Sequence, residues 1–467
     1  MNRSDEYNEL LEELENTPLK LDFTLDRAKL KRNEHNRHTR RAIFTPLGTI
    51  AAVFVIFVLL VNVSPTFAYA TGRVPLLRDL AKFVAMSPSL SAAVENEYVQ
   101  PMGLEQTLNG ITARVEYVIV DQKQLDIFYT LNSDNYSAMD ATPDLMDSDG
   151  KFLSECGIST GGYSGNGELR KIVVDFASGI MPDTVKLRLK IRDIGSPTLN
   201  APLQATDDLL LTKVEPAEPV FLFEPEFTLK LDPSFTDKGE VIQPCRSFIM
   251  DSQKFILTSA EIYPTHMRFT FDDDSVNTAW MTGIEFYVEN EKGERFESVS
   301  SGITAFGKID SPMIQTYMLE SPFFSKSDHL TLYITGVTWL DKNMEKVHVD
   351  LNKTSADALP EGVKFEQARK MKNGWSLAFS APVFEENHYY QIWSSTYFDP
   401  NGNKYSINSS STSGDGYFDE SKQAEVALPN RFTESFGLID YPYDEVWLCP
   451  SYSRCVTLDT PIRIEIK

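Results

Sequence analysis

One uncharged stretch constrains this chain more than any other feature: residues 42–70 contain no Asp, Glu, Lys or Arg. Its centre, Leu47–Val63, consists of Leu, Ile, Val, Phe, Ala, Gly, Thr and a single Asn. A helix rises about 1.5 Å per residue, so roughly 20 apolar residues cross the hydrocarbon core of a membrane. A helix also satisfies its own backbone hydrogen bonds in lipid. We therefore predict one transmembrane helix over residues 42–65.

Basic residues gather on the N-terminal side of this span. Seven Lys and Arg side chains lie from Arg27 to Arg41, opposed only by Glu34, whereas Arg73 and Arg78 alone follow closely on the other side. The positive-inside rule then places the N-terminus in the cytoplasm and the large C-terminal region outside. The sequence thus predicts a single-pass protein of the cell membrane.

A cleaved signal peptide is the alternative interpretation of the same stretch. Residues 67–70 read Phe-Ala-Tyr-Ala, which looks like a small-residue cleavage site, and cleavage there would release a secreted binding module. The charged leader before the span is unusually long for a signal peptide and carries a helical pattern of its own, which favours the membrane anchor.

The leader, residues 1–41, contains an amphipathic pattern. Ser4 can cap a helix whose apolar side chains then recur at helical spacing: Tyr7, Leu10, Leu11 and Leu14. Glutamates occupy the other face. Helices this short are marginal alone in water, so the apolar stripe favours a partner's groove, and the acidic face suits a basic partner surface. The alternative is a leader that only sets topology.

The net charge of −23 lies outside this leader. Residues 1–45 carry nine basic and nine acidic side chains, so the whole excess belongs to the rest of the chain. An acidic exterior argues against nucleic acid as a ligand, because phosphate binding needs Lys and Arg, and it disfavours anionic wall polymers. The simplest interpretation is solvation of a surface protein.

Residues 66–99 form a connector in which residues 74–85 have helical spacing and Pro88 ends the helix. After this connector, three segments each begin with a pair of strands, at Ala113, Lys254 and Lys364. Each pair is followed at a nearly constant interval by a polar turn with glycine, at Gly150, Gly293 and Gly402. A late strand follows, beginning at Val185, Leu330 and Glu445.

A repeat of roughly 100 residues with strands and hairpin turns is typical of an immunoglobulin-like β-sandwich. Alternation in VKLRLKIR and HMRFTFD indicates that one face of each strand is buried and the other is wet. We predict a mostly β protein with three tandem sandwiches, at residues 100–200, 215–355 and 356–467.

Two regions resemble known families. The span, with the following VNVSPTFAYATGRVPLLRDLAKFV and NGITARVEYVIVDQKQLDIFYTL, resembles the Gram-positive bacterial family called domain of unknown function 4179, over about residues 40–135. The stretch from Phe227 to about Asp350, with FTLKLDPSF and KFILTSAEIYPTHMRF, is similar to domain of unknown function 5643. The last hundred residues resemble no family that we can name.

The first resemblance implies a function. Members of that family often look like membrane-anchored anti-sigma factors, each paired with an extracytoplasmic-function sigma factor. The stripe formed by Tyr7, Leu10, Leu11 and Leu14 is then the expected sigma-factor contact. Zinc-containing anti-sigma domains use a His-x3-Cys-x2-Cys motif, and no cysteine precedes Cys156, so we expect binding without zinc. The alternative is a structural or adhesive cell-surface protein.

Four cysteines are too few for a disulfide scaffold. Cys449 and Cys455 could close a small loop as a disulfide on an oxidising side of the membrane, and free thiols are the other interpretation.

Signals for chemistry are weak. Ser148–Lys151 matches the SxxK motif but falls in a predicted turn, where its two side chains do not lie one helical turn apart. The aspartates at 272–274 could bind calcium with Asp399 or Asn401, but no complete loop pattern is present. The histidines, His266 among them, fit ordinary strand positions. We predict no enzyme, no cofactor and no metal site.

Overall fold

The computed structural model describes residues 77–154, 156–161, 165–177, 181–195, 220–236, 239–299, 302–308, 311–383, 391–419 and 424–467. The chain divides into two compact units, Met1–Arg78 and Asp79–Lys467, and nearly all described residues belong to the second. The predicted leader and membrane helix lie outside the described residues. Within the described ranges, no helix is both long enough and apolar enough to cross a membrane.

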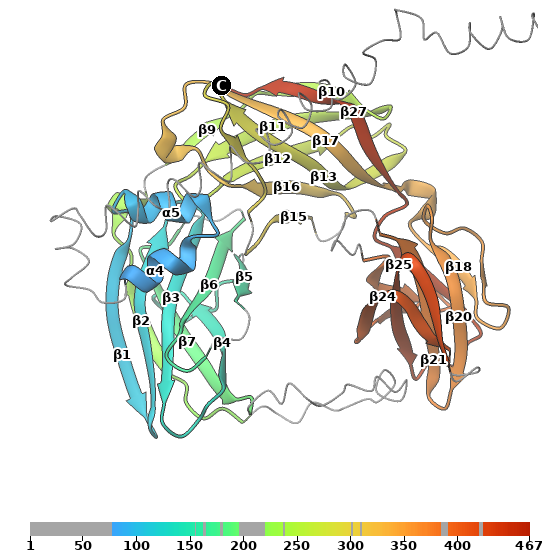
Figure 1. Cartoon of the computed structure of the whole chain (residues 1–467), viewed down its shortest axis with the longest axis horizontal. Coiled ribbons are helices and arrows are strands. Elements are labelled where there is room, and N and C mark those ends of the chain that lie inside the picture. Colours follow the sequence, from blue (N-terminus) through green and yellow to red (C-terminus); the bar gives the residue numbers. More distant parts are fainter. Residues whose placement is uncertain are drawn as a thin grey trace, which may run out of the picture. The chain divides into compact units, whose positions relative to one another are not determined.

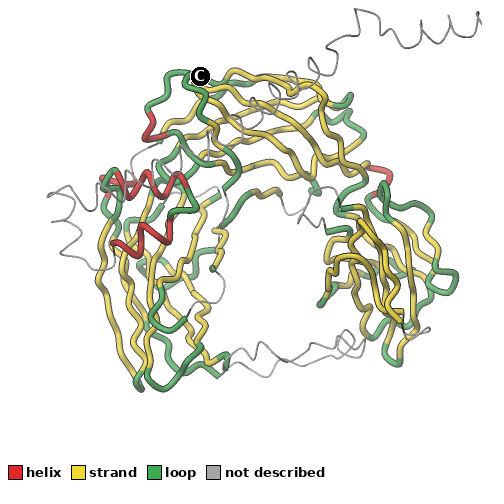
Figure 2. The backbone as a smooth tube through the Cα atoms, in the orientation of Figure 1, coloured by secondary structure: helices red, strands yellow, loops and turns green. Residues whose placement is uncertain are grey.

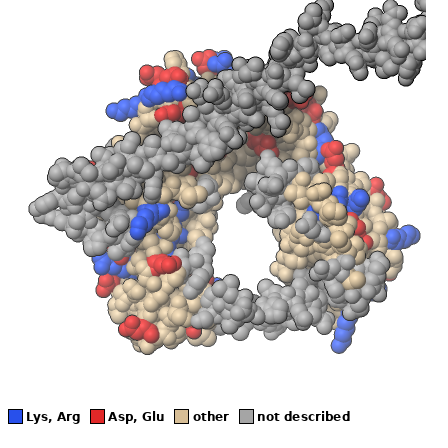
Figure 3. All heavy atoms as spheres, viewed as in Figure 1, with Lys and Arg blue, Asp and Glu red and all other residues tan. Residues whose placement is uncertain are grey.

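The described chain is mostly β, as predicted, with helix confined to short segments (Figures 1 and 2). The strands group into six sheets, which we assign to three domains. The first domain is residues 77–236, the second is residues 239–341 together with 454–467, and the third is residues 342–453. On the face in Figure 3, acidic and basic side chains are interspersed.

The first domain contains two antiparallel sheets with strand orders β1-β2-β3-β6-β5 and β4-β7-β8. Its strands are β1 (Gln100–Leu108), β2 (Ile111–Val120), β3 (Gln124–Ser133), β4 (Met139–Met146), β5 (Cys156–Thr160), β6 (Leu169–Phe176), β7 (Thr184–Asp193) and β8 (Glu226–Lys230). One core joins the two sheets, with Val118 and Ile127 from the first and Leu187 and Phe227 from the second. A short helix, α7 (Pro233–Thr236), follows β8.

Strand β7 confirms the alternation predicted for VKLRLKIR. Its apolar residues are fully buried, and the basic residues between them face outward. Acidic residues on the two flanking strands neutralise three of these bases, in the pairs Lys190–Asp144 (3.0 Å), Arg192–Asp140 (2.8 Å) and Arg188–Glu226 (3.1 Å). This face therefore offers no continuous basic stripe.

Two helices precede the first strand, α4 (Leu77–Val84) and α5 (Pro88–Glu95), where the sequence predicted one short helix within the connector. Pro88 does not simply end a helix. It begins α5, because its missing N–H has no intrahelical partner there, and the Ser87 side chain caps the helix by accepting from the backbone N–H of Leu90. The Phe83 ring lies edge-on to Phe128 at 6.0 Å, so the helices pack on the first sheet (Figure 1).

The second domain contains the sheets β10-β11-β12-β16-β15, with β9 beside β11, and β14-β13-β17-β27. Its strands are β9 (Glu240–Ile242), β10 (Arg246–Met250), β11 (Gln253–Ile262), β12 (Met267–Asp273), β13 (Ala279–Asn290), β14 (Arg295–Phe296), β15 (Ala305–Gly307), β16 (Ile314–Leu319), β17 (Leu330–Asp341) and β27 (Arg454–Glu465). A 3-10 turn, η1 (Phe323–Ser325), precedes β17. Phe271 and Trp339 lie in the core between the two sheets.

The third domain contains the sheets β20-β21-β25-β24 and β19-β18-β26-β22-β23. Its strands are β18 (Val347–Asp350), β19 (Ser355–Ala356), β20 (Lys364–Met371), β21 (Gly374–Pro382), β22 (Trp393–Phe398), β23 (Lys404–Ser406), β24 (Ser410–Asp419), β25 (Ala424–Ile439) and β26 (Glu445–Pro450). A 3-10 turn, η2 (Lys342–Met344), leads into it. Phe379 and Trp393 lie at the centre of its core.

The three domains share one order of seven strands. Numbered by their places in the sheets, these strands form one sheet in the order 1-2-5-4 and a second in the order 3-6-7. The numbers follow the chain except in the third domain, where β18 takes place 7 but precedes strand 1. The remaining strands lie at sheet edges: β1, β9, β10, β14, β19 and β23. The predicted strand pairs are strands 1 and 2 of each domain, namely β2–β3, β11–β12 and β20–β21. The predicted late strands β7, β17 and β26 are strand 6 in each. The repeat found in the sequence is therefore present as antiparallel hairpins and a central strand of the second sheet.

The predicted domain boundaries are wrong where they assign strand 7. In the first domain this place is filled by β8, which was predicted to belong to the second. In the second domain it is filled by β27, from the end of the predicted third segment, and in the third domain by β18, from the predicted second segment. The second and third domains thus exchange their seventh strands, and local periodicity carries no information about this choice of partner.

Candidate functional site

A network of buried polar side chains joins the first and second domains. It starts at Asp121, which is fully buried in the turn between β2 and β3. One carboxylate oxygen accepts hydrogen bonds from the backbone N–H groups of Lys123 and Gln124, both at 2.8 Å, and so shapes its own turn. The other oxygen accepts from the backbone N–H of Thr265 at 3.1 Å and from its hydroxyl at 2.6 Å. One aspartate therefore fixes a turn of the first domain to a turn of the second.

His266 continues this network inside the second domain. Its Nε2 accepts from Arg268 Nε at 2.8 Å, so the proton of a neutral ring lies on Nδ1, which is 2.7 Å from the Thr265 hydroxyl oxygen. The Thr265 hydroxyl in turn donates to Asp121. Burial, followed by the charge of Arg268, lowers the pKa of His266 well below its usual value. The imidazole is therefore a neutral bridge between Arg268 and Asp121.

Arg268 carries the contact back into the first domain. This residue belongs to β12, and it is 2% exposed. Its guanidinium donates a hydrogen bond of 2.5 Å to the carboxylate of Asp175, at the end of β6. It also donates to the backbone carbonyl of Phe176 at 3.1 Å and to that of Lys123 at 3.3 Å. A planar group with five donors can hold several acceptors at once, so this single side chain binds both the end of β6 and the β2–β3 turn of the first domain.

A second contact fastens helix α5. Glu320, at the end of β16 and 5% exposed, accepts from the backbone N–H of Ser89 at 2.8 Å and from the Ser87 hydroxyl at 3.2 Å. The Ser89 hydroxyl accepts from the backbone N–H of Ser321 at 2.6 Å. The first turn of α5 is thus bound to the second domain, and we call this set of contacts, together with the Asp121 and Arg268 contacts, the junction.

Buried carboxylates outnumber buried cations in the junction. Burial raises the pKa of Asp175 to about 6, although the Arg268 charge lowers it. Burial also raises the pKa of Asp126, a β3 residue outside the junction and 3.9 Å from Lys171 Nζ, to about 6. The pKa values of Asp121 and Glu320 are raised by burial as well. The junction therefore binds protons more readily than exposed carboxylates do.

This arrangement is suited to holding parts of the chain together. Asp121, His266 and Arg268 are at most 2% exposed, so they offer no surface to a substrate. The contacts of the junction join the second domain to β6, to the β2–β3 turn and to α5. The junction is thus a candidate route by which a structural change in the second domain could reach the helices that precede the first strand.

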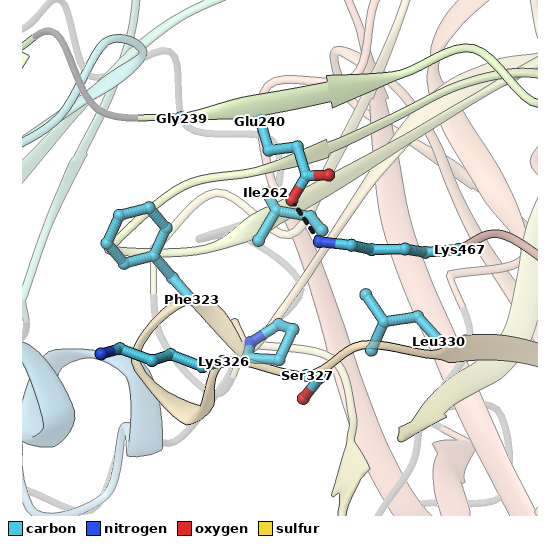
Figure 4. Close-up of a pocket in the computed structure, with 9 residues that line it drawn as sticks. Gly239, Glu240, Ile262, Phe323, Lys326, Ser327, Leu330 and Lys467 are labelled. Atoms are coloured by element: carbon cyan, nitrogen blue, oxygen red, sulfur yellow. Dashed lines mark hydrogen bonds and ion pairs between the residues drawn. The ribbon is translucent and has the colours of Figure 1, made fainter. Parts of the chain in front are cut away.

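A pocket of about 190 Å³ lies at one end of the second domain (Figure 4). Ile262, Phe323 and Leu330 form its apolar wall, and Lys467 Nζ lies 2.7 Å from Glu240 Oε2 across it. Lys326 points away from this ion pair in the view shown. Because Lys467 and Glu240 neutralise each other, this ion pair provides no unpaired charge for a charged ligand.

The residues predicted from sequence lie elsewhere. Tyr7, Leu10, Leu11 and Leu14 are outside the described residues, so the contact stripe stays a prediction. Cys449 and Cys455 are both free thiols, and the disulfide considered for them is not formed. Cys449 lies on β26 in the third domain and Cys455 on β27, opposite Thr338 of the second. The strand exchange separates the two cysteines, because consecutive strands enter different sheets.

In the turns considered for chemistry, aspartate side chains accept hydrogen bonds from backbone N–H groups. Asp147 Oδ1 accepts from the backbone N–H groups of Asp149 and Lys151, so Ser148–Lys151 forms a tight turn. Asp274 accepts from Val276 and pairs with Lys254 at 3.0 Å. Among the described residues, no group of three or more His, Cys, Asp or Glu side chains could hold a metal ion.

The junction itself was missed by the sequence analysis. His266 was assigned to an ordinary strand position, and the alternation in HMRFTFD placed Arg268 on a wet face. That expectation is wrong because the first domain covers this face: Asp175, the partner of Arg268, is 93 residues earlier in the chain. Periodicity identifies which face of a strand a residue occupies, and it does not show whether another domain covers that face.

The comparisons with known proteins identify two regions of the chain. Residues 38–133 match the domain of unknown function DUF4179, and residues 239–363 match the family of unknown function DUF5643. Both resemblances noted in the sequence are therefore confirmed. No curated protein matches the chain. The chain is also similar to a crystal structure of the conserved domain protein from Bacillus anthracis, at 12% identity and a TM-score of 0.36, over 60% of this chain and 85% of that one.

Proposed function

We propose that this chain, which carries a DUF4179 and a DUF5643 region, is a single-pass membrane regulator of the anti-sigma type. Its leader holds a cytoplasmic extracytoplasmic-function sigma factor, and its three β domains face the outside of the cell and respond to a condition or partner in the envelope. The family resemblance suggests the regulatory role, and the junction supports it.

The observation that carries the proposal is the attachment of α5 to Glu320. This helix lies between the predicted membrane helix and the first strand, where a flexible linker would insulate the leader from the outer domains. Instead, Ser87 and Ser89 are bound to the second domain through a buried carboxylate. A change in the second domain can therefore reach the segment next to the predicted span.

The strand order supports recognition modules of the immunoglobulin type. Orders of 1-2-5-4 and 3-6-7 correspond to the A-B-E-D and C-F-G sheets of an immunoglobulin constant-type domain. We therefore propose that all three domains are immunoglobulin-like. Such domains commonly present their loops and sheet faces to other molecules, which suits an envelope sensor.

Binding by the leader is the direct test. Residues 1–45, tethered to a resin, should capture a sigma factor from cytoplasmic lysate without added zinc. The matched control carries Leu10→Asp and Leu14→Asp, which place charges in the apolar stripe and should abolish capture. If the native leader binds no sigma factor, the regulator proposal fails, and an adhesive or structural surface role becomes the better explanation.

A second experiment tests the route through the junction. In cells with a reporter for the captured sigma factor, the full chain carrying Glu320→Ala should alter the response to envelope stress while the leader still binds the sigma factor. Glu240→Ala, in an exposed ion pair of the same domain, is the control. An unchanged stress response with Glu320→Ala would remove the junction from the mechanism and leave the leader's role intact.

A further inference from the structure

The exchange of seventh strands gives the second and third domains an unusual connection. The chain leaves the second domain after β17 and fills the seventh place of the third domain with β18. It returns after β26 and fills the seventh place of the second domain with β27. The third domain is thus inserted between two neighbouring strands of the second.

Strand lengths fix this arrangement. β17 and β27 each have 12 residues, and their pairing runs from Thr331 to Trp339. β18 has only 4 residues, and all four pair with residues of the 6-residue β26. Because β18 is too short to cover β17, it cannot replace β27 in the second domain.

β27 also completes the core of the second domain. Ile464 of β27 and Ile466, which follows it, are each 7% exposed and lie among the buried residues of that domain. Loss of β27 would uncover this part of the core and leave the backbone of β17 without its partner on that side. The sheets of the third domain contain no residue of β27. Cys455, at the start of β27, packs against the core of the third domain as a partly buried side chain, whereas Val456, Leu458, Ile462 and Ile464 pack in the core of the second.

The two connecting segments are bound to each other where they cross. The Ser453 hydroxyl donates to the Asp341 carboxylate at 2.8 Å, and the backbone N–H of Ser453 donates to the carbonyl of Trp339 at 2.6 Å. Ser453 is 3% exposed. While the third domain is folded, it therefore holds the start of β27 next to the end of β17.

We infer that the third domain acts as a strap on the second: opening the third domain releases β27 from β17, whereas removing β27 leaves the third domain folded. The coupling has a direction because it arises from chain connectivity. Once the third domain is unfolded, β27 is joined to β17 only by a loop of residues 342–453. Closing a loop of about 110 residues weakens docking of β27 by up to roughly a thousandfold. This inference does not depend on the proposed function.

Hydrogen exchange of the full chain tests both directions. Phe379→Asp with Leu448→Asp places two charges in the core of the third domain, where both side chains are fully buried. Strands β21 and β25 should lose protection, and amides of β17 and β27 should exchange faster by a factor of up to roughly a thousand. Phe379→Leu with Leu448→Met, which keeps the core apolar, should leave β17 and β27 protected.

A chain ending after Ser453 tests the reverse direction. It should lose protection in β13 and β17 and retain it in β21 and β25. Two results would overturn the inference: an unfolded third domain with unchanged exchange in β17 and β27, or loss of protection in the third domain after truncation. The second result would mean that β27 belongs to the third domain.

Discussion

Replacement of Asp126 by Asn should remove part of the pH dependence of the first domain. This aspartate is fully buried on β3, and one of its oxygens accepts from Gln124 Nε2 at 2.7 Å. Within the described structure the other oxygen has no hydrogen bond and lies 3.9 Å from Lys171 Nζ. Burial is the largest cause of its raised pKa of about 6, with Lys171 acting against it.

The sign follows from the direction of the pKa shift. A carboxyl group whose pKa is raised on folding contributes stability that is complete below its unfolded pKa and is lost as pH rises through its folded value. For Asp126 the window runs from its ordinary pKa of 3.8 to about 6. Between pH 5 and 7.5 the loss amounts to about 1 kcal/mol.

Hydrogen exchange of β3 amides provides the assay, because a chain of several domains does not unfold in two states. Opening free energies of the native protein should fall from pH 5 to pH 7.5 after correction for intrinsic exchange rates. In Asp126→Asn that fall should be smaller by about 1 kcal/mol. Asp144→Asn, on the outer face of the second sheet, is the matched control and should change the slope little.

The same pH dependence in Asp126→Asn and in the native protein would refute this reasoning. It would mean that Asp126 ionises near its ordinary pKa, and therefore that burial in β3 does not disfavour the charged form as the geometry requires.

Three further predictions concern single groups. Glu320→Ala should raise the exchange of the first amides of α5 by about tenfold, since a charged hydrogen bond contributes about 1.5–3 kcal/mol and relief of burial offsets part of it. Arg268→Met should destabilise the first domain by about 3–5 kcal/mol, measured by exchange in β6, because Asp175 is left buried without its cation. Cys449 and Cys455 should both alkylate in unfolded protein that was never reduced, counted by intact mass.

Each of these predictions has a result that contradicts it. An unchanged α5 with Glu320→Ala would show that the helix is held by apolar packing alone. Stability unaffected by Arg268→Met would place Asp175 in contact with water. Two cysteines protected from alkylation until a reductant is added would show a disulfide, and with it a different arrangement of β26 and β27.

The sequence was sufficient for features set by neighbouring residues. β7 was predicted with the correct buried face because every second residue is apolar and each basic residue between can reach water. The hairpin of β20 and β21 was predicted from its place in the repeat, at a nearly constant interval before the polar turn at Gly402. These elements depend on periods of two residues and on local turn chemistry.

Features set by distant partners were not predictable in this way. The residue periodicity of β27 does not distinguish a strand that pairs with β26 from one that pairs with β17, and the matching lengths of β17 and β27 are known only from the structure. Arg268 likewise has the pattern of an exposed strand residue until Asp175 and Phe176 are brought beside it. Registers between domains and buried ion pairs depend on contacts across roughly 100 residues or more.

Because Asp341 and Ser453 are in contact, the two ends of the third domain lie close together, and the domain could be removed without separating β17 from β27. Since the two residues are in hydrogen-bond contact, a short turn could join β17 directly to β27 and leave the second domain contiguous. The same position could accept a different folded insert, provided that its own ends lie close together. Chains that keep the first two domains and differ at this point would then share one mode of attachment while presenting different outer surfaces.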